Sequence, residues 1–157
     1  MNEISQHSDN TPVTIFFCYA HEDEALLKRL QMHLKPLQRH KLVGVLWHDR
    51  NISAGMEWER EIDSHLDAAQ IILLLISPDF IASDYCYGIE MQRALERHKR
   101  GEARVIPVIL RSVYWQLLPF SALQALPTDA KPVMSSAWHD PDEAFRNVAE
   151  EIHKVIR

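Results

Sequence analysis

The amino-acid sequence predicts a single α/β domain built around a parallel sheet. Compact apolar runs rich in β-branched residues alternate along the chain with stretches whose apolar residues recur at helical spacing. One run, Ile71–Ile76, is apolar at every position, which is typical of a central strand that is covered on both faces. At 157 residues, the chain is long enough for one such domain and too short for two ordinary ones.

The elements of the first half follow from these patterns. Residues 1–11 are polar and are expected to form a flexible leader, and Val13–Cys18 is the first predicted strand. Leucines at helical spacing predict a helix after it: Leu26, Leu30 and Leu34. Pro36 is expected to end or kink this helix, because proline lacks a backbone N–H and its ring clashes with the preceding turn. Val43–Trp47 is the second predicted strand, and another helix is indicated by apolar residues on one face: Trp58, Ile62, Leu66 and Ala69.

The chain after the central strand continues the alternation. Ser77 and Pro78 are expected to stop the strand, and a helix is predicted from about Asp84 to His98. Arg104–Leu110 is the next predicted strand. Because Pro107 cannot donate to a neighbouring strand, this strand is expected near the sheet edge or with a bulge.

The C-terminal part begins irregularly and ends in a well-signalled helix. Only Pro132–Met134 is a candidate for a short strand there. Asp140 fits a helix cap, Pro141 fits the first helical position, and Glu143 completes a capping box. Together these elements predict a right-handed, doubly wound sheet.

The composition excludes several classes of protein. A formal net charge of -5 argues against nucleic-acid binding, and no apolar run is long enough to span a membrane. Cys18 and Cys86 alone imply no disulfide framework, so a reducing, cytoplasmic location is expected. The 9 histidines lack ligand spacing, so no metal site is expected. The 4 glycines do not assemble a dinucleotide fingerprint or a P-loop.

The candidate site lies where strands end, because ligands of open α/β sheets bind outside the carboxyl ends of the strands. Glu90 is placed early in the helix after the third strand, with Tyr85 and Cys86 able to share its face. A glutamate in this position also has a structural interpretation, as a partner of the helix dipole or of Arg93. Both interpretations are open at this point.

Several ordered segments resemble a Toll/interleukin-1 receptor (TIR) domain of the bacterial type. They are the strings VTIFFCYAHEDEALL, LWHDRNISAGMEWEREIDSHLDAAQIILLLISPDFIASDYCYGIEM and RVIPVILRSVYW, and the resemblance extends over about residues 13–156. It implies a TIR domain at residues 12–157. It also implies a flavodoxin-like three-layer sandwich with a central five-stranded parallel sheet.

The resemblance also implies an activity, because many TIR domains cleave NAD+ at the bond between nicotinamide and ribose. Glu90 matches the catalytic glutamate of these enzymes, and Tyr85 or Cys86 stands where many members place a tryptophan. The remaining residues expected to contact the substrate follow the first two strands: Tyr19, Ala20, His21, Asp49, Ile52, Gly55 and Trp58. NAD+ is the substrate, and no cofactor is expected.

The sequence departs from the family pattern beside the proposed substrate. Ala20 and His21 replace a basic pair found in some members, and Tyr85 lies five residues before Glu90. The resemblance implies self-association and a role as effector in bacterial defence or signalling, within a chain that can carry further domains. The alternatives are a non-enzymatic TIR interaction module and a nucleoside hydrolase of related fold. Linear and cyclic ADP-ribose are both open as products.

Overall fold

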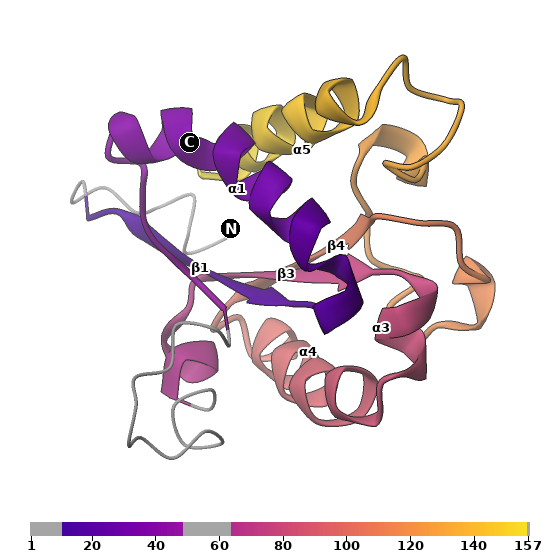
Figure 1. The fold of residues 1–157 in the computed structure, drawn as a ribbon. Coiled ribbons are helices and arrows are strands. Elements are labelled where there is room, and N and C mark those ends of the chain that lie inside the picture. The colour runs from indigo at the N-terminus through magenta and orange to yellow at the C-terminus, as the bar shows by residue number, and fades with distance from the viewer. Residues whose placement is uncertain (1–10, 49–63, 157) are drawn as a thin grey trace.

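A parallel four-stranded sheet forms the centre of the computed structural model, which describes residues 11–48 and 64–156 (Figure 1). Its strands are β1 (Val13–Cys18), β2 (Val43–Trp47), β3 (Ile71–Ile76) and β4 (Arg104–Ile109), in the order β2-β1-β3-β4. The prediction of a central, doubly covered strand is confirmed, since β3 lies between β1 and β4 and all of its residues are buried. The strand containing Pro107 is at the sheet edge, as predicted.

Helices cover both faces of this sheet (Figure 1). On one face lie α1 (Glu24–Arg39) and α5 (Pro141–Ile156), and on the other lie α3 (Pro78–Ala82), α4 (Met91–Lys99) and the helical residues 64–68. Successive side chains of β1 therefore enter different cores: Ile15 and Phe17 pack with α1 and α5, whereas Phe16 and Cys18 pack with α4. Shorter elements are η1 (His21–Asp23), η3 (Tyr85–Glu90), η4 (Trp115–Leu117) and η5 (Thr128–Ala130). Within the described ranges, no helix has the length and apolar character needed to cross a bilayer.

The described residues form four strands rather than the five that were expected. Leu126 makes a single-residue bridge to Val108, and the N–H of Val133 donates to the carbonyl of Ile109 at 2.9 Å. Neither segment extends into a strand: Leu126 forms an isolated bridge, and residues 132–134 have no strand assignment although the N–H of Met134 also donates to the carbonyl of Leu110 at 2.9 Å. The prediction of a strand at 132–134 is therefore wrong.

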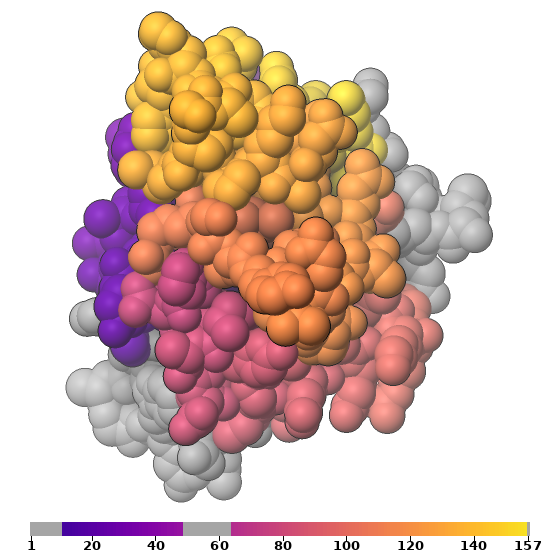
Figure 2. Space-filling view, turned by 90° about the vertical axis from the view of Figure 1, so that its right-hand side faces the viewer, coloured from indigo at the N-terminus to yellow at the C-terminus, as the bar shows by residue number. Residues whose placement is uncertain are grey.

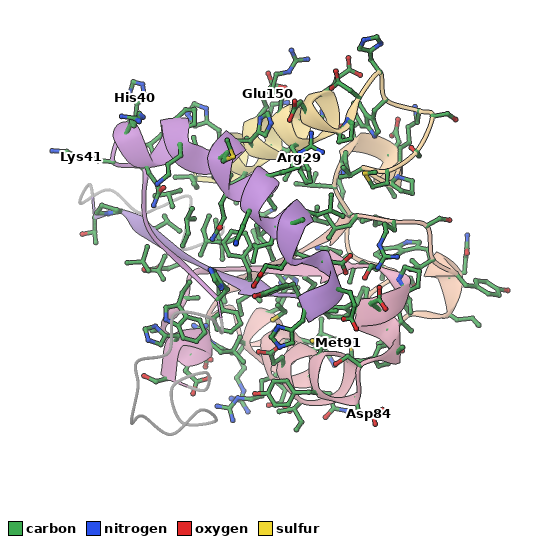
Figure 3. All side chains as sticks on the ribbon, in the orientation of Figure 1. Arg29, His40, Lys41, Asp84, Met91 and Glu150 are labelled. Atoms are coloured by element: carbon green, nitrogen blue, oxygen red, sulfur yellow. The ribbon has the colours of Figure 1, made fainter. Side chains whose placement is uncertain are left out.

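The first helix is longer than the sequence predicts, because α1 continues through Pro36 to Arg39. Because Pro36 has no N–H, the carbonyl of Met32 has no hydrogen-bond partner from it within the helix. Both residues lie on the exposed side of α1, where water can bond to this carbonyl. Leu34 and Leu37 are buried on the opposite side and hold the last turns against the sheet. Lys41 lies just beyond the helix end (Figure 3). It takes a left-handed conformation with φ of 60°.

The helix predicted from about Asp84 to His98 consists of two parts, and a further helix precedes it. Residues Tyr85–Glu90 form a π-helical turn that leads directly into α4. The preceding α3 lies in a segment for which the sequence analysis predicted no helix. Its start is nevertheless typical, since Ser77 Oγ accepts the N–H of Phe80 at 3.1 Å and Pro78 takes the first position.

The last helix begins at the predicted cap Asp140, although the Glu143 side chain bonds one residue before this cap, and the first turn of the helix contacts α1. The N–H of Glu143 donates to Asp140 Oδ1 at 2.9 Å, and the N–H of His139 donates to Glu143 Oε1 at 3.3 Å. Arg29 lies where α1 and α5 meet and donates to Asp142 Oδ1 at 3.1 Å (Figure 3).

Arg97 joins α4 to the neighbouring helical residues 64–68. Its guanidinium donates to the carbonyls of Leu66 and Ala69, each at 2.6 Å, and to the carbonyl of Glu102 at 3.0 Å. The carbonyls of Leu66 and Ala69 lie at the end of a helix, where they have no partner within the helix itself. One side chain therefore satisfies two part-buried acceptors and one exposed acceptor.

Replacing Arg97 by alanine is expected to lower the free energy of unfolding by about 2 kcal/mol, because carbonyls lose charge-assisted hydrogen bonds. Arg97→Lys is expected to restore little of this, since an ammonium does not reproduce the planar fork of donors. Urea unfolding measures both variants. Arg100→Ala, at an exposed position of the same helix end, is the control. Equal unfolding midpoints for Arg97→Ala and Arg100→Ala would contradict the assignment.

His98 links the end of α4 to the outer edge of β4. Its Nδ1 accepts the N–H of Val105 at 3.1 Å, so the neutral ring carries its proton on Nε2. Burial, and then the charge of Arg104, lower the pKa of His98 below its ordinary value of 6.5. The fold thus favours the neutral imidazole.

Acid is expected to weaken the fold through this residue. Because the pKa is lower in the folded chain, the unfolded chain binds more protons, and stability falls as the pH decreases below 6.5. His98→Gln keeps an acceptor without titrating, so its free energy of unfolding is expected to depend less on pH between about 5 and 7. His40→Gln, at an exposed position, is expected to keep the wild-type slope. Identical slopes for the wild type and His98→Gln would refute this prediction.

Candidate functional site

A cavity of about 340 Å³ opens at the carboxyl ends of β1 and β3. These two strands are neighbours in the sheet, and the chain moves outward from β1 to β2 on one side and from β3 to β4 on the other. This is the position where the strand order reverses and where open α/β sheets bind ligands. Figure 2 views the molecule from the side where the strands end, and residues near 80–90 and 110–120 lie side by side on it.

The cavity brings together six of the residues predicted from the sequence. Its described lining is Tyr19, Ala20, His21, Glu22, Asp79, Ala82, Ser83, Tyr85, Cys86 and Glu90. The first of these leave β1 and the last belong to η3, so segments about seventy residues apart along the chain share one wall. The other predicted contacts, Asp49, Ile52, Gly55 and Trp58, lie outside the described residues.

Glu90 is the buried acidic residue of this cavity. Its exposed fraction is 5%, and it is the last residue of the π-helical turn. Neighbouring Glu22 also lines the cavity but is exposed to solvent. Because a carboxylate interacts more strongly with a nearby cation where water is excluded, Glu90 is the better placed of the two to stabilise positive charge in the cavity.

The π-helical turn explains how Tyr85 reaches the same wall as Glu90. The N–H of Met91 bonds to the carbonyl of Cys86, five residues earlier, instead of the usual four. In an α-helix, side chains five residues apart point about 140° away from each other. The wider turn reduces this angle, and both Tyr85 and Glu90 line the cavity. The spacing that departs from the family pattern is therefore compatible with a shared site.

Cys86 ties this turn to the end of β1. Its thiol is buried and donates to the carbonyl of Tyr19 at 3.3 Å, while its N–H donates to Ser83 Oγ at 3.2 Å. The ring of Tyr19 has His21 and His48 at its edges, with centroid distances of 6.0 and 5.8 Å. Contacts among Tyr19, Cys86 and their neighbours therefore hold two walls of the cavity at a fixed separation.

An ion-pair cluster beside the cavity was missed by the sequence analysis. Arg111, which follows β4, donates through Nε to Asp23 Oδ1 at 3.1 Å and also pairs with Asp79. Ser77 donates from its hydroxyl to the other oxygen of Asp23. The hydrogen bond to Asp79, followed by the charge of Asp23, raises the pKa of Arg111. The cluster joins the segments after β1, β3 and β4, and Asp79 lines the cavity itself.

The fold and the position of this cavity define a parallel α/β domain with a cavity at the carboxyl ends of its strands, and the family follows from comparison. Residues 15–149 match the family model described as "TIR domain", and the chain belongs to this family.

A relative and two solved structures show the range of similar proteins. The "Uncharacterized protein y4lF" of Sinorhizobium fredii is 51% identical over 142 residues, which is 90% of this chain and 43% of the relative. The chain thus spans less than half the length of that relative. The TIR domain of the Toll-related receptor TRR-2 from Hydra magnipapillata has a TM-score of 0.59 and 19% identity, covering 88% of this chain and 97% of the other. A weaker match is to TIR domains of the activated Roq1 resistosome, with a TM-score of 0.49, 17% identity and coverage of 88% and 84%.

Proposed function

We propose that this TIR domain is an NAD+ glycohydrolase that releases nicotinamide and leaves ADP-ribose or its cyclic isomer. The observation that carries the proposal is the position of Glu90, a buried carboxylate in the wall of a cavity at the strand-order reversal. The TIR family includes members that cleave NAD+. The cavity volume of about 340 Å³ lies within the usual range of small-molecule sites and suits one end of the dinucleotide.

The chemistry requires only one carboxylate. Nicotinamide leaves the pyridinium as a neutral base, so no general acid has to protonate it. As the glycosidic bond breaks, positive charge develops on the ribose, as in glycoside hydrolysis. Glu90 stabilises this charge directly or through hydrogen bonds to the ribose hydroxyls. Water, or a nucleophilic atom of the adenine of the same molecule, then forms the new bond to the ribosyl carbon, and one proton is released to solvent.

Other residues that line the cavity are proposed to position the substrate. Tyr19 and Tyr85 line the cavity and offer aromatic faces to the nicotinamide ring. His21 is exposed at the rim, where its ring can donate to a phosphate oxygen, whereas Glu22 repels phosphates from its own side. Asp49, Ile52, Gly55 and Trp58 remain proposed contacts from the segment after β2.

The second candidate function is an interaction module that signals by assembling with other TIR domains. Exposed apolar side chains after β4 favour it, since Tyr114 and Leu117 are 69% and 72% exposed. The two functions are compatible if self-association increases turnover, and the longer S. fredii relative is consistent with further domains in such a protein. A role as an effector in bacterial defence or signalling is compatible with both the enzymatic function and the interaction module.

Nicotinamide release by the purified chain tests the enzymatic proposal. The chain is incubated with NAD+ over a range of protein concentrations, and nicotinamide and ADP-ribose isomers are separated by chromatography. Activity per molecule is expected to rise with concentration, because assembly is proposed to support the site. No release at any concentration, with assembly verified by light scattering, would leave the interaction module as the better function. Turnover of nucleosides without turnover of NAD+ would instead support the nucleoside hydrolase.

A further inference from the structure

A second and larger cavity, of about 530 Å³, lies at the outer edge of β4, away from the candidate active site. The sheet ends here, since β4 has a strand neighbour on one side and, among the described residues, only the single-residue bridge to Leu126 on the other. The helices α4 and α5 cover opposite faces of the sheet (Figure 1). Residues from the ends of both helices, from β4 and from the segment 122–126 line the cavity, which therefore opens across the sheet edge.

One part of this cavity is apolar. Its aliphatic lining includes Val105 and Leu126, which are buried, and Leu123 and Val155, which are half-buried and pack against the two cores. These side chains come from both sides of the sheet edge. A cavity of this size with aliphatic walls can hold a hydrocarbon chain of moderate length.

Among the described residues, the polar lining of the cavity carries an excess of one positive charge. Lys154 and Glu151 both line the cavity and neutralise each other through a contact of 2.8 Å. Arg104 is a half-buried residue, and among the described residues no carboxylate lies within ion-pair distance of it. Since a guanidinium out of bulk water favours a planar anion that accepts two parallel hydrogen bonds, Arg104 favours a carboxylate.

His98 adds a neutral donor to this charge. Its Nδ1 is occupied by the N–H of Val105, so the ring presents an N–H at Nε2 rather than a lone pair. The charge of Arg104 balances a single negative charge, and the N–H of His98 can donate a further hydrogen bond to the same anion. A dianionic phosphate would be left undercompensated, and Glu151 would repel it.

We propose that this cavity binds an amphipathic monocarboxylate, with its carboxylate on Arg104 and its hydrocarbon chain between Leu123 and Val155. A medium-chain fatty acid has this chemistry. The site is separate from the cavity that contains Glu90, and its occupation requires no turnover of NAD+.

Isothermal titration calorimetry with octanoate tests the proposal, with octylamine and octanol as probes of the same chain length. Octanoate is expected to bind, and the two control probes are expected to bind at least about tenfold more weakly. Arg104→Gln is expected to weaken octanoate binding by about tenfold or more, because it removes a charged partner. Lys99→Gln is the control, because Lys99 is exposed at the end of α4 and does not belong to the described lining of the cavity. This variant is expected to bind octanoate as the wild type does.

Ala122→Trp provides a test that does not depend on charge. Ala122 is exposed and lines the cavity, so a large ring there fills it without disturbing either core. Loss of octanoate binding in both Arg104→Gln and Ala122→Trp supports the site. The proposal is overturned by any of three results: absence of binding at millimolar octanoate, equal binding of octanol, or undiminished binding in either of these variants.

Discussion

Replacing Glu90 by glutamine is expected to reduce nicotinamide release by about 100-fold or more, the usual cost of removing one group that stabilises transition-state charge. Glutamine has nearly the same shape as glutamate but no charge, so the wall of the cavity stays filled. The loss is expected in kcat, because the interaction forms as the ribosyl cation develops. Steady-state kinetics on NAD+, together with a thermal unfolding curve for the variant, measures it.

Glu22→Gln is the matched control for this prediction. Glu22 lines the same cavity but is exposed, so its charge is screened by water and salt. Its removal is expected to change the rate by only a few-fold. If both variants lost activity equally, the general negative potential of the cavity would be responsible. If a folded Glu90→Gln retained full activity, the catalytic assignment would be wrong.

Replacing Arg111 by methionine is expected to lower the free energy of unfolding by about 3 kcal/mol, because it leaves a buried carboxylate without its cation. The side chain of Asp23 is 1% exposed, and its ion pair with Arg111 measures 3.0 Å. Arg111 is itself 35% exposed, which places the expected cost at the lower end for a buried pair. Urea unfolding of the variant and the wild type provides the measurement.

A double-mutant cycle separates the charge from the packing. The double variant Asp23→Asn/Arg111→Met removes both charges, and it is expected to recover a large part of the loss, because no ion remains buried. The introduced asparagine amide would still accept the hydroxyl of Ser77 through its oxygen. A destabilisation by Arg111→Met of less than about 0.5 kcal/mol, the range of ordinary surface substitutions, would show that the cluster contributes no stability.

The strands were predictable because each is a short run of mostly apolar residues that can be recognised from the sequence alone. Val13–Cys18, Val43–Trp47 and Ile71–Ile76 form strands with the predicted bounds, and the continuous apolar run of the last identified it as central. The start of α5 was also predictable, since its cap depends on neighbours in the sequence. Helix α3 was missed because its five residues are too few to show helical periodicity, although Ser77 and Pro78 signalled its start.

The candidate site was predictable only in part. Its position after β1 and β3 follows from the rule for parallel sheets, and the resemblance to TIR domains selected Glu90, Tyr19 and Tyr85. The cluster of Arg111 with Asp23 and Asp79 was not predictable, because Arg111 lies 88 and 32 residues away from its two partners, and the three follow different strands. No local pattern records such a contact.

The π-helical turn has a consequence for comparing this chain with other sequences. A wider turn accommodates one more residue than the α-helical turn it replaces. A relative whose helix lacks it would therefore have one residue fewer between the aromatic side chain and the glutamate. An alignment across Tyr85–Glu90 then requires a gap of one position, and a search pattern with a fixed spacing would fail to recognise the pair. Two such proteins would differ in length here while presenting the same side chains to the cavity.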